Sequence, residues 1–282
     1  MRYGGSFPVT DWADMMVLRD IAQALDEGGM DYCSMATHVL GHPLGTFPNE
    51  MLHHYYGPFR EPLVLFAWLA GQTHRIVFRT AVLIMPIYPT ALLAKQTADI
   101  SIATGGRLEI GVGISWNERE YRALEQNFHT RGARIEEQLV VLRRLWTEPF
   151  VTFKGRWHDL DEIGLNQLPP HIPLLIGAGI TEALQRRVAR LGDGWVPLTD
   201  PVEPLKNLRR YVEEEGKDWS TFKVSGRLMV GDTGPQQWLE TTRRLHEAGI
   251  NDMEIFPGRG WTGLAAAEKL LEVRDVLRGE FG

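Results

Sequence analysis

The stretch Ala103-Thr104-Gly105-Gly106-Arg107-Leu108-Glu109-Ile110-Gly111-Val112-Gly113-Ile114-Ser115-Trp116-Asn117-Glu118 decides the fold. Gly105-Gly106 predicts the end of a helix, because glycine adopts the left-handed C-cap conformation without strain from a Cβ atom. The following segment is apolar on both faces, apart from one glutamate and two glycines, which is typical of a parallel strand covered on both sides. Ser115 and Asn117 follow the carboxyl end of this strand, where α/β sheets and barrels bind ligands.

The rest of the chain repeats this alternation of strand and helix. Apolar runs predict strands over residues 3–8, 31–35, 76–85, 108–114, 174–176, 194–197, 222–230 and 252–256, and a helical pattern follows each one. Alternating strands and helices imply a parallel sheet with right-handed crossovers. Eight such units in 282 residues, close to the roughly 250 of a (β/α)8 barrel, predict an α/β TIM barrel. We expect residues 1–282 to form a single barrel domain.

Two segments depart from the regular strand-and-helix unit. Residues 36–61, after the second strand, show no period and are rich in Gly, Pro, His and aromatic residues. A connection of this length in a compact domain is usually functional. Phe150 to Leu160, after the fourth strand, alternates apolar and polar residues around Lys154-Gly155-Arg156 and predicts a hairpin. We therefore expect insertions after strand 2 and after strand 4.

Charge and cysteine content exclude several classes of partner. The net charge is −6 and the arginines are scattered over predicted helices, so we expect no nucleic-acid partner. Cys33 is the only cysteine, which excludes an internal disulfide and fits a reducing cytoplasm. Because Cys33 lies in an apolar strand, we expect its side chain to pack in the core. The chain runs from Met1 into a strand without a signal peptide, and no apolar run reaches the roughly 18 residues that cross a bilayer. We expect a cytoplasmic protein without a membrane partner.

The segment from Leu174 to Ala183 is the sharpest local motif. It predicts a buried strand, the small-residue turn Gly177-Ala178-Gly179, and a helix N-terminus whose free N–H groups suit a phosphate. The alternative is a tight loop that only needs small residues. Neither this turn nor Gly111-Val112-Gly113 completes G-x-G-x-x-G, because Glu182 and Trp116 hold the third position. A Rossmann fold is therefore disfavoured.

A few side chains at strand ends are candidates for chemistry. His38 follows the second strand, where an imidazole can exchange a proton near neutral pH, although a histidine bonded to loop backbone would fit the same position. No carboxylate lies at metal-ligand spacing from it, so we expect no metal. The small side chains of Thr80-Ala81-Val82 would suit contact with a flat ring. The alternative is that they only pack in the barrel core. Aromatic side chains near strand ends and inserted loops predict an apolar substrate pocket; these are Trp12, Phe47 and Trp195.

Several motifs in order resemble the bacterial luciferase-like monooxygenase family. They are Ala94–Asp99, Thr104–Leu108, Gly111–Glu120, Arg131–Arg134, Leu145–Thr147, Phe153–Gly155, Ile176–Gly179 and Gly192–Trp195. The resemblance covers about residues 1 to 200 well and the last third loosely. The branch that depends on coenzyme F420 is the most similar, and the FMN branch shares most of the motifs.

This resemblance implies a barrel that holds F420 or FMN across its C-terminal mouth. The phosphate would lie on Gly177-Ala178-Gly179, and Ser115 and Asn117 would contact the ribityl chain or the phosphate. Ala81-Val82 would form a bulge under the ring, often with a non-proline cis peptide, and His38 would face the ring edge as the catalytic proton donor or orienter. The full predicted cofactor site is Phe7, His38, Thr80, Ala81, Val82, Ser115, Asn117, Gly177, Ala178 and Gly179.

Two departures from the family pattern bear on the substrate. Thr37 stands where many deazaflavin members have Asp, and Ile114 stands where members that oxidise sugar phosphates have Glu. The second departure argues against a hydroxyl-bearing, anionic substrate and for an apolar one. We expect an oxidoreductase that uses F420 for hydride transfer to or from a small, largely apolar molecule.

The sequence leaves three alternatives to this expectation. The first is an FMN-dependent monooxygenase of the same family, and the second is a non-catalytic cofactor-binding subunit, which typically lacks the phosphate-turn glycines that this chain has. The third, a phosphosugar aldolase or isomerase, needs a Schiff-base lysine or paired carboxylates at strand ends. The resemblance further suggests a homodimer, and a flavin or F420 reductase is a candidate partner for supplying reduced cofactor.

Overall fold

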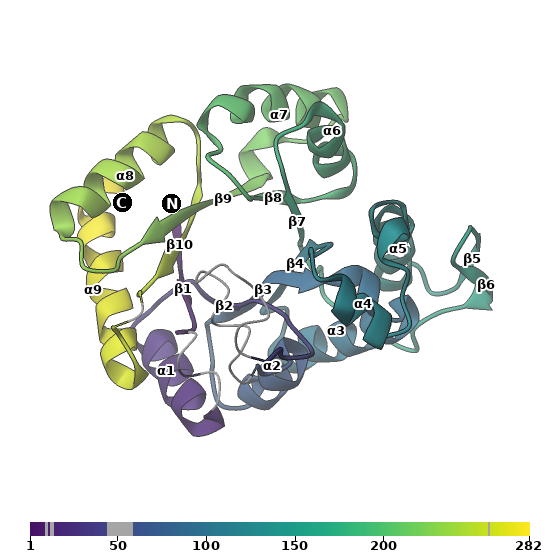
Figure 1. Cartoon of the computed structure of the whole chain (residues 1–282), viewed down its shortest axis with the longest axis horizontal. Helices are drawn as coiled ribbons and strands as arrows, with labels where there is room; N and C mark the ends of the chain where they lie inside the picture. Colours follow the sequence, from purple (N-terminus) through teal and green to yellow (C-terminus); the bar gives the residue numbers. More distant parts are fainter. Residues whose placement is uncertain (9–10, 12–13, 44–58, 259) are drawn as a thin grey trace.

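Parallel strands form a closed barrel in the centre of the molecule. The computed structural model describes residues 1–8, 11, 14–43, 59–258 and 260–282. Within them, eight strands close in the order β1-β10-β9-β8-β7-β4-β3-β2, with helices around the outside (Figure 1). The barrel strands are β1 (Arg2–Ser6), β2 (Tyr32–Met35), β3 (Val77–Ile84), β4 (Leu108–Gly113), β7 (Leu174–Ala178), β8 (Gly194–Pro197), β9 (Lys223–Met229) and β10 (Asp252–Phe256). The predicted α/β TIM barrel is confirmed.

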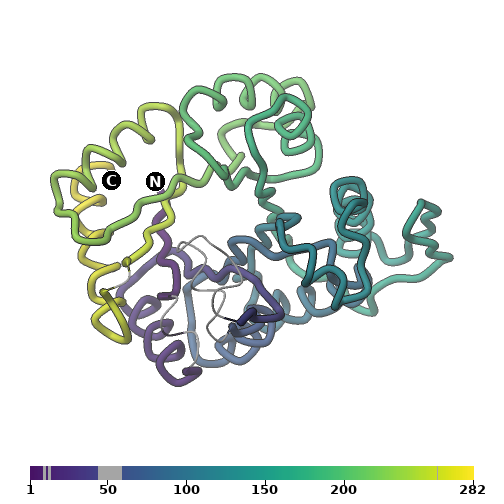
Figure 2. Tube along the Cα trace, in the orientation of Figure 1, coloured from purple at the N-terminus to yellow at the C-terminus, as the bar shows by residue number. Residues whose placement is uncertain are grey.

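Helices cover the barrel between successive strands. They are α1 (Met15–Glu27), α2 (Pro62–Ala70), α3 (Thr90–Thr104), α4 (Glu118–Ala123), α5 (Arg131–Thr147), α6 (Glu182–Leu191), α7 (Val202–Glu214), α8 (Pro235–Glu247) and α9 (Gly263–Phe281), with short 3-10 turns η3 (Met85–Ile87), η4 (Phe128–Thr130) and η5 (Trp219–Thr221). The last helix, α9, runs beside α1, and both chain ends lie on this side of the molecule (Figure 2). No helix among the described residues is long and apolar enough to span a membrane.

The decisive stretch folds as predicted, with one addition. Helix α3 ends at Gly105 in the left-handed conformation (φ 67°), and β4 is buried along its whole length. Gly111 and Gly113 do allow a close approach, but what approaches is the neighbouring strand β3. A Cβ atom on Gly111 would lie 2.2 Å from the Thr80 carbonyl oxygen, and one on Gly113 would lie 2.7 Å from Val82 Cγ2. These glycines are therefore required by strand packing.

The contact with β3 occurs at an irregularity of that strand. The register between β3 and β4 shifts between Thr80 and Leu83, and the Ala81–Val82 peptide bond is cis. Both features match what the family resemblance implied for this dipeptide.

Charged side chains fill the end of the barrel at which the strands begin. Arg79 lies at the centre of this Arg79 cluster, with its Nε 2.8 Å from Glu109 Oε2 and its Nη1 2.6 Å from Asp252 Oδ1. The guanidinium carbon also lies 3.6 Å from the centre of the Tyr32 ring. The remaining members of the cluster are Arg2, Lys223 and Ser225. The sequence showed Glu109 as the one charge in an apolar strand, and the cluster explains it.

The cluster holds its carboxylates in the ionised form. Burial alone would raise the pKa of Asp252, but the Arg79 guanidinium outweighs burial and lowers that pKa below its usual value. The same balance, with Arg79, Arg2 and Lys223 as the cations, lowers the pKa of Glu109. Cys33 is buried in the core as predicted, and burial raises the pKa of its thiol.

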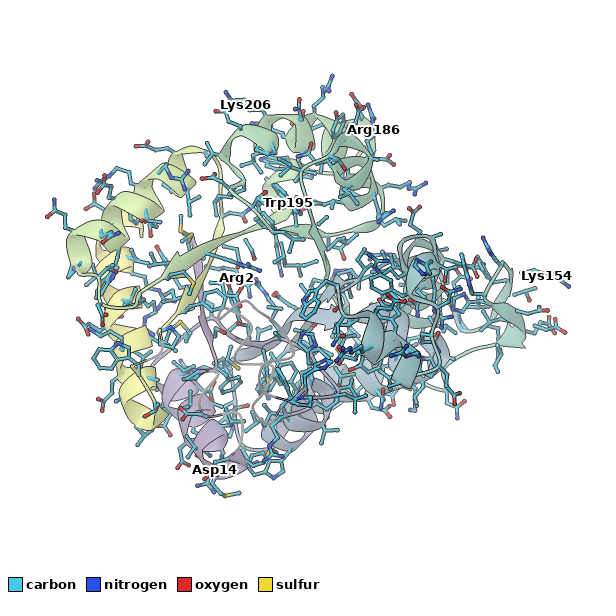
Figure 3. All side chains as sticks on the ribbon, in the orientation of Figure 1. Arg2, Asp14, Lys154, Arg186, Trp195 and Lys206 are labelled. Atoms are coloured by element: carbon cyan, nitrogen blue, oxygen red, sulfur yellow. The ribbon has the colours of Figure 1, made fainter. Side chains whose placement is uncertain are left out.

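A hairpin follows α5, where the alternating pattern predicted one. Its antiparallel strands are β5 (Val151–Lys154) and β6 (Asp159–Ile163), and it extends away from the barrel with Lys154 near its tip (Figures 1 and 3). The Glu137 carboxylate on α5 anchors the turn, since it accepts the backbone N–H groups of residues 156–158 at 2.8–2.9 Å. The predicted segment after strand 2 lies mostly outside the described residues.

We expect Arg79→Met to destabilise the fold strongly, because it leaves buried carboxylates without their main partner. Removing one member of a buried ion pair costs about 3–5 kcal/mol. Denaturant unfolding measures the change. Arg209→Gln is the control: its ion pair with Glu213 is solvent-exposed, and such pairs contribute under about 0.5 kcal/mol. Equal stability of the two variants would contradict a supporting role for Arg79.

Candidate functional site

A cavity of about 370 Å³ lies at the carboxyl ends of β2, β3, β4 and β7. Chain topology places it there, because all barrel strands are parallel and their carboxyl ends meet at one mouth. The cavity is lined by Ala36, Thr37, His38, Ala81, Val82, Ile84, Gly113, Ile114, Ser115, Trp116, Gly177 and Leu198. Most of the lining is apolar, and its polar groups come from the loops after β2 and β4.

Five of the residues predicted for the cofactor site line this cavity: His38, Ala81, Val82, Ser115 and Gly177. They lie on four different strands or the loops that follow them.

The Val82 side chain bridges β4 and β7 beneath the cavity. A Cβ atom on Gly113 would lie 2.7 Å from Val82 Cγ2, and one on Gly177 would lie 3.1 Å from Val82 Cγ1. Both glycines lack the side chain that would displace Val82. The result is a flat apolar platform of Ala81 and Val82 across the barrel mouth.

His38 is fixed by a buried carboxylate that the sequence prediction did not include. Its Nδ1 lies 2.9 Å from Glu120 Oε2, and the two side chains are 8% and 1% exposed. The other carboxylate oxygen of Glu120 accepts the backbone N–H groups of Val39 and Leu40. Glu120 therefore attaches the first residues of the loop after β2, His38 to Leu40, to helix α4. The His38 ring also packs on Phe59, with 5.3 Å between ring centres.

These contacts determine the charge of Glu120 and the tautomer of His38. Burial raises the pKa of Glu120, but the hydrogen bond from His38 and the backbone N–H groups outweigh it, so the pKa lies below its usual value. An ionised Glu120 only accepts hydrogen bonds, so His38 donates from Nδ1. A neutral His38 then carries its acceptor at Nε2.

Glu120 was overlooked because it occupies the third position of a helix. The motif Asn117-x-x-Glu120 looks like a capping arrangement, and Asn117 does cap α4 by accepting the Glu120 N–H. The signal that identifies Glu120 is its burial, at 2% exposure, in a helix whose other glutamate, Glu118, is exposed. The sequence alone does not give that burial.

One hydroxyl group at the cavity has no hydrogen-bond partner within the part of the chain that the structure describes. Thr37 is 1% exposed, lines the cavity, and its Oγ1 is unsatisfied. An unsatisfied buried hydroxyl costs about 1–3 kcal/mol, which a bound polar group would relieve. On the opposite side, Ser115 adopts the left-handed conformation (φ 55°), and its Oγ accepts the Asn117 N–H at 3.3 Å.

The small-residue turn after β7 leads into the exposed N-terminus of α6. Thr181 is the N-cap residue of this ten-residue helix, and its side chain makes no capping hydrogen bond. Gly179 is partly exposed, and a Cβ atom there would meet only Leu184 Cδ1, at 3.5 Å. The helix therefore offers backbone N–H groups that no side chain caps, beside an open turn.

Four other predicted cofactor contacts do not line the cavity, and Gly179 lies at its edge on the open turn. Phe7 is buried in the core, and Thr80 donates to the Gly111 carbonyl at 2.8 Å. The Asn117 side chain is used in capping α4 and in a 2.8 Å contact with His42. Ala178 is buried, and its carbonyl accepts the Trp195 indole N–H at 3.0 Å.

Trp195 faces the helices rather than the predicted substrate pocket. It pairs in register with Ile176, whereas the neighbouring Gly177 faces the cavity. Since alternate strand residues face opposite sides, the indole lies on the outer face of β8, fully buried towards α6 and α7 (Figure 3). Trp12 and Phe47, the other predicted pocket residues, lie outside the described residues.

Comparisons with known proteins agree with this geometry. A family model described as luciferase-like monooxygenase matches residues 8–269. An uncharacterized protein of Mycobacterium tuberculosis is 34% identical over 203 residues, which cover 70% of this chain and 68% of that protein. An F420-dependent glucose-6-phosphate dehydrogenase of Kineococcus radiotolerans is 26% identical over 237 residues, which cover 80% of this chain and 67% of the enzyme.

Among solved structures, an F420-dependent secondary alcohol dehydrogenase in complex with an F420-acetone adduct has a TM-score of 0.80. The match covers 99% of this chain and 100% of that one, at 15% identity. This likeness is one of fold.

We expect Glu120→Gln to lower the free energy of unfolding by about 1–3 kcal/mol, because an amide cannot accept from His38 and both backbone groups as a carboxylate does. The pKa of Glu120 is lower in the folded state, so its contribution is complete above the unfolded value near 4.3 and is lost as pH falls through the folded value. Unfolding at pH 7 and pH 3 measures this.

Glu118→Gln is the matched control on the same helical turn. Glu118 is 65% exposed, and its contact with His129 spans 4.0 Å, so the change should stay within about 0.5 kcal/mol at both pH values. A Glu120→Gln protein whose stability deficit is as large at pH 3 as at pH 7 would contradict the ionised carboxylate.

Proposed function

Since this chain belongs to the luciferase-like monooxygenase family and is an oxidoreductase that depends on F420 or FMN, we propose that it uses reduced F420 for hydride transfer to or from a small, largely apolar organic substrate. The cavity over Ala81 and Val82 carries the proposal, because it combines a flat apolar platform with a buried, carboxylate-oriented histidine. We further propose that the whole chain acts as one barrel domain.

The residues of the cavity fit a phosphorylated, flat cofactor. Ala81 and Val82 would lie under the ring, and the unsatisfied Thr37 hydroxyl would hydrogen-bond to its polar edge. Ser115 would contact the ribityl chain. The N–H groups at the start of α6, next to Gly177 and Gly179, would bind the phosphate, because a helix N-terminus favours an anion. When bound, F420 supplies a ring carbon that carries or accepts the hydride.

His38 would provide the proton that accompanies hydride transfer. Glu120 fixes the imidazole with Nδ1–H as donor, so Nε2 is the nitrogen that would exchange a proton with the substrate oxygen. The negative charge of Glu120 stabilises the imidazolium form, as the carboxylate does in other carboxylate–histidine pairs. Glu120 is thus a positioning residue, and His38 is the proposed catalytic residue.

F420 is preferred over FMN because two curated relatives with named activities, a glucose-6-phosphate dehydrogenase and a hydroxymycolic acid dehydrogenase, depend on F420. The alternative is an FMN-dependent monooxygenase that activates oxygen with the same cavity. A non-catalytic subunit is disfavoured by the intact turn Gly177-Ala178-Gly179.

We also propose a homodimer and a reductase that supplies reduced cofactor. An apolar groove between α2 and α3 supports the first proposal, with Val64 63% exposed beside Leu63, Ala67 and Ile100.

Titration with each cofactor, followed by fluorescence, tests the proposal. We expect F420 to bind the purified protein in the micromolar range or tighter, and FMN to bind more weakly. If FMN binds and F420 does not, the cofactor of the proposed function is FMN instead of F420. Binding of neither cofactor would overturn the proposed function.

Gly179→Asp, compared with Gly179→Asn, locates the phosphate in the same titration. Either side chain fits, because the position is open. Only Asp adds a negative charge, so we expect it to weaken binding by at least about tenfold, or about 1.4 kcal/mol, with Asn close to wild type. Equal effects of the two substitutions would contradict a phosphate at this turn.

We expect His38→Ala to retain the F420 dissociation constant while lowering kcat by about 10²–10⁴-fold, the usual contribution of a general acid or base. Cofactor titration and the rate of F420 oxidation or reduction over a panel of alcohols, aldehydes and ketones measure the two effects. Unchanged turnover would reduce His38 to a structural role.

A further inference from the structure

Arg227 lies on the inner face of β9, at the mouth of the barrel. Ser225 points inward, since Arg79 Nη1 lies 3.2 Å from its hydroxyl oxygen. Gly226 points outward, because a Cβ atom there would meet Met253 and Leu245. Alternation along the strand therefore turns Arg227 inward. Unlike Ser225, it is exposed, so it lies near the open end of the barrel interior.

Two apolar side chains lie near Arg227, which also adjoins the proposed cofactor cavity. Its guanidinium carbon lies 6.0 Å from the centre of the Phe256 ring, and Met229, the next inward residue of β9, is 64% exposed. Leu198 lines both the cofactor cavity and a second pocket that includes Arg227. Arg227 thus lies next to the cofactor cavity, with Met229 and Phe256 as neighbours that suit the apolar part of a ligand.

The guanidinium of Arg227 makes no hydrogen bond or ion pair with another residue of the described ranges. Its strand neighbour Glu254 is 1% exposed and accepts a hydrogen bond from Ser34. Burial raises the pKa of Glu254, and the charge of Arg227 lowers it without outweighing burial. The other charges of the second pocket, Asp200 and Arg244, pair with each other at 2.6 Å. Arg227 therefore faces the mouth as a cation that has no direct carboxylate partner among the described residues.

We propose that Arg227 binds a carboxylate group of the substrate, so that the substrate is an amphiphilic carboxylic acid whose apolar part lies against Met229 and Phe256. A guanidinium matches a carboxylate in a bidentate pair. A single cation among apolar side chains favours a monoanion, because a phosphate dianion would keep an uncompensated charge. This inference rests on the proposed function, since it places the substrate in the mouth beside the cofactor.

A carboxylate group departs from the substrate expected from the sequence, since the residue at Ile114 favours an apolar molecule without an anionic group. Ile114 lines the cofactor cavity and gives it an apolar wall, in agreement with an apolar body. The anionic group would lie on the other side of the mouth, at β9. The sequence motifs do not reveal Arg227, because only the register of β9 shows which of its residues face inward.

Isothermal titration of the F420-loaded protein with phenylacetate and with phenylacetamide tests the assignment. The two probes have the same shape and differ in charge. We expect phenylacetate to bind at least about tenfold more tightly to the wild type. Arg227→Gln should abolish this preference. The control is the double variant Asp200→Asn/Arg244→Gln, which removes the neighbouring neutral pair without changing the net charge and should retain the preference.

The outcomes separate this inference from the proposed function. If F420 binds but wild type shows no preference for phenylacetate, the carboxylate assignment is wrong and the cofactor proposal stands. If Arg227→Gln weakens the binding of F420 itself tenfold, Arg227 binds an acidic group of the cofactor. The assignment of Arg227 to the substrate is then overturned as well. If the wild type does not bind F420, the proposed function fails first, independently of either probe.

Discussion

The packing of Val82 across glycines on two neighbouring strands is the constraint on which the site depends. The side chain needs the space over Gly113 and Gly177, and the Thr80 carbonyl needs the space over Gly111. β3 can therefore deviate from regular pairing at the barrel mouth and still pack tightly against β4. What results is a shallow apolar platform, with the polar loops after β2 and β4 at its edge. A larger side chain at any of the three glycines would force the strands apart.

The opposite end of the barrel has a different kind of interior. The interior of a (β/α)8 barrel is usually filled by layers of branched apolar side chains. Here, the charged side chains of the Arg79 cluster fill the end at which the strands begin. Arg79 satisfies Glu109 and Asp252 together and packs on Tyr32. Buried ion pairs of this kind are costly when a partner is lost and weak when complete. The cluster therefore makes the strand register specific, while the mouth stays open to ligand.

The sequence predicts the fold well because the patterns that indicate strands and helices are local. Apolar strands, glycine helix stops and helical stripes each depend on a few neighbouring residues, and the strand at Gly194–Pro197 matches its predicted bounds. The sequence places a residue at the cavity where this depends on position at a strand end, as for His38 and Ser115. The prediction from sequence fails where a contact links distant segments of the chain or depends on the direction of a side chain. Glu120 is 82 residues from His38, and Trp195 faces outward because of its register with Ile176.

The central claim is that the mouth over Ala81 and Val82 holds a flat redox cofactor. A crystal structure of the protein soaked with F420 and, separately, with FMN tests it most directly. The account predicts ring density over this dipeptide, with His38 at the ring edge and the phosphate at the start of α6. Density for either cofactor in another cavity, with the space beside His38 empty, would contradict it.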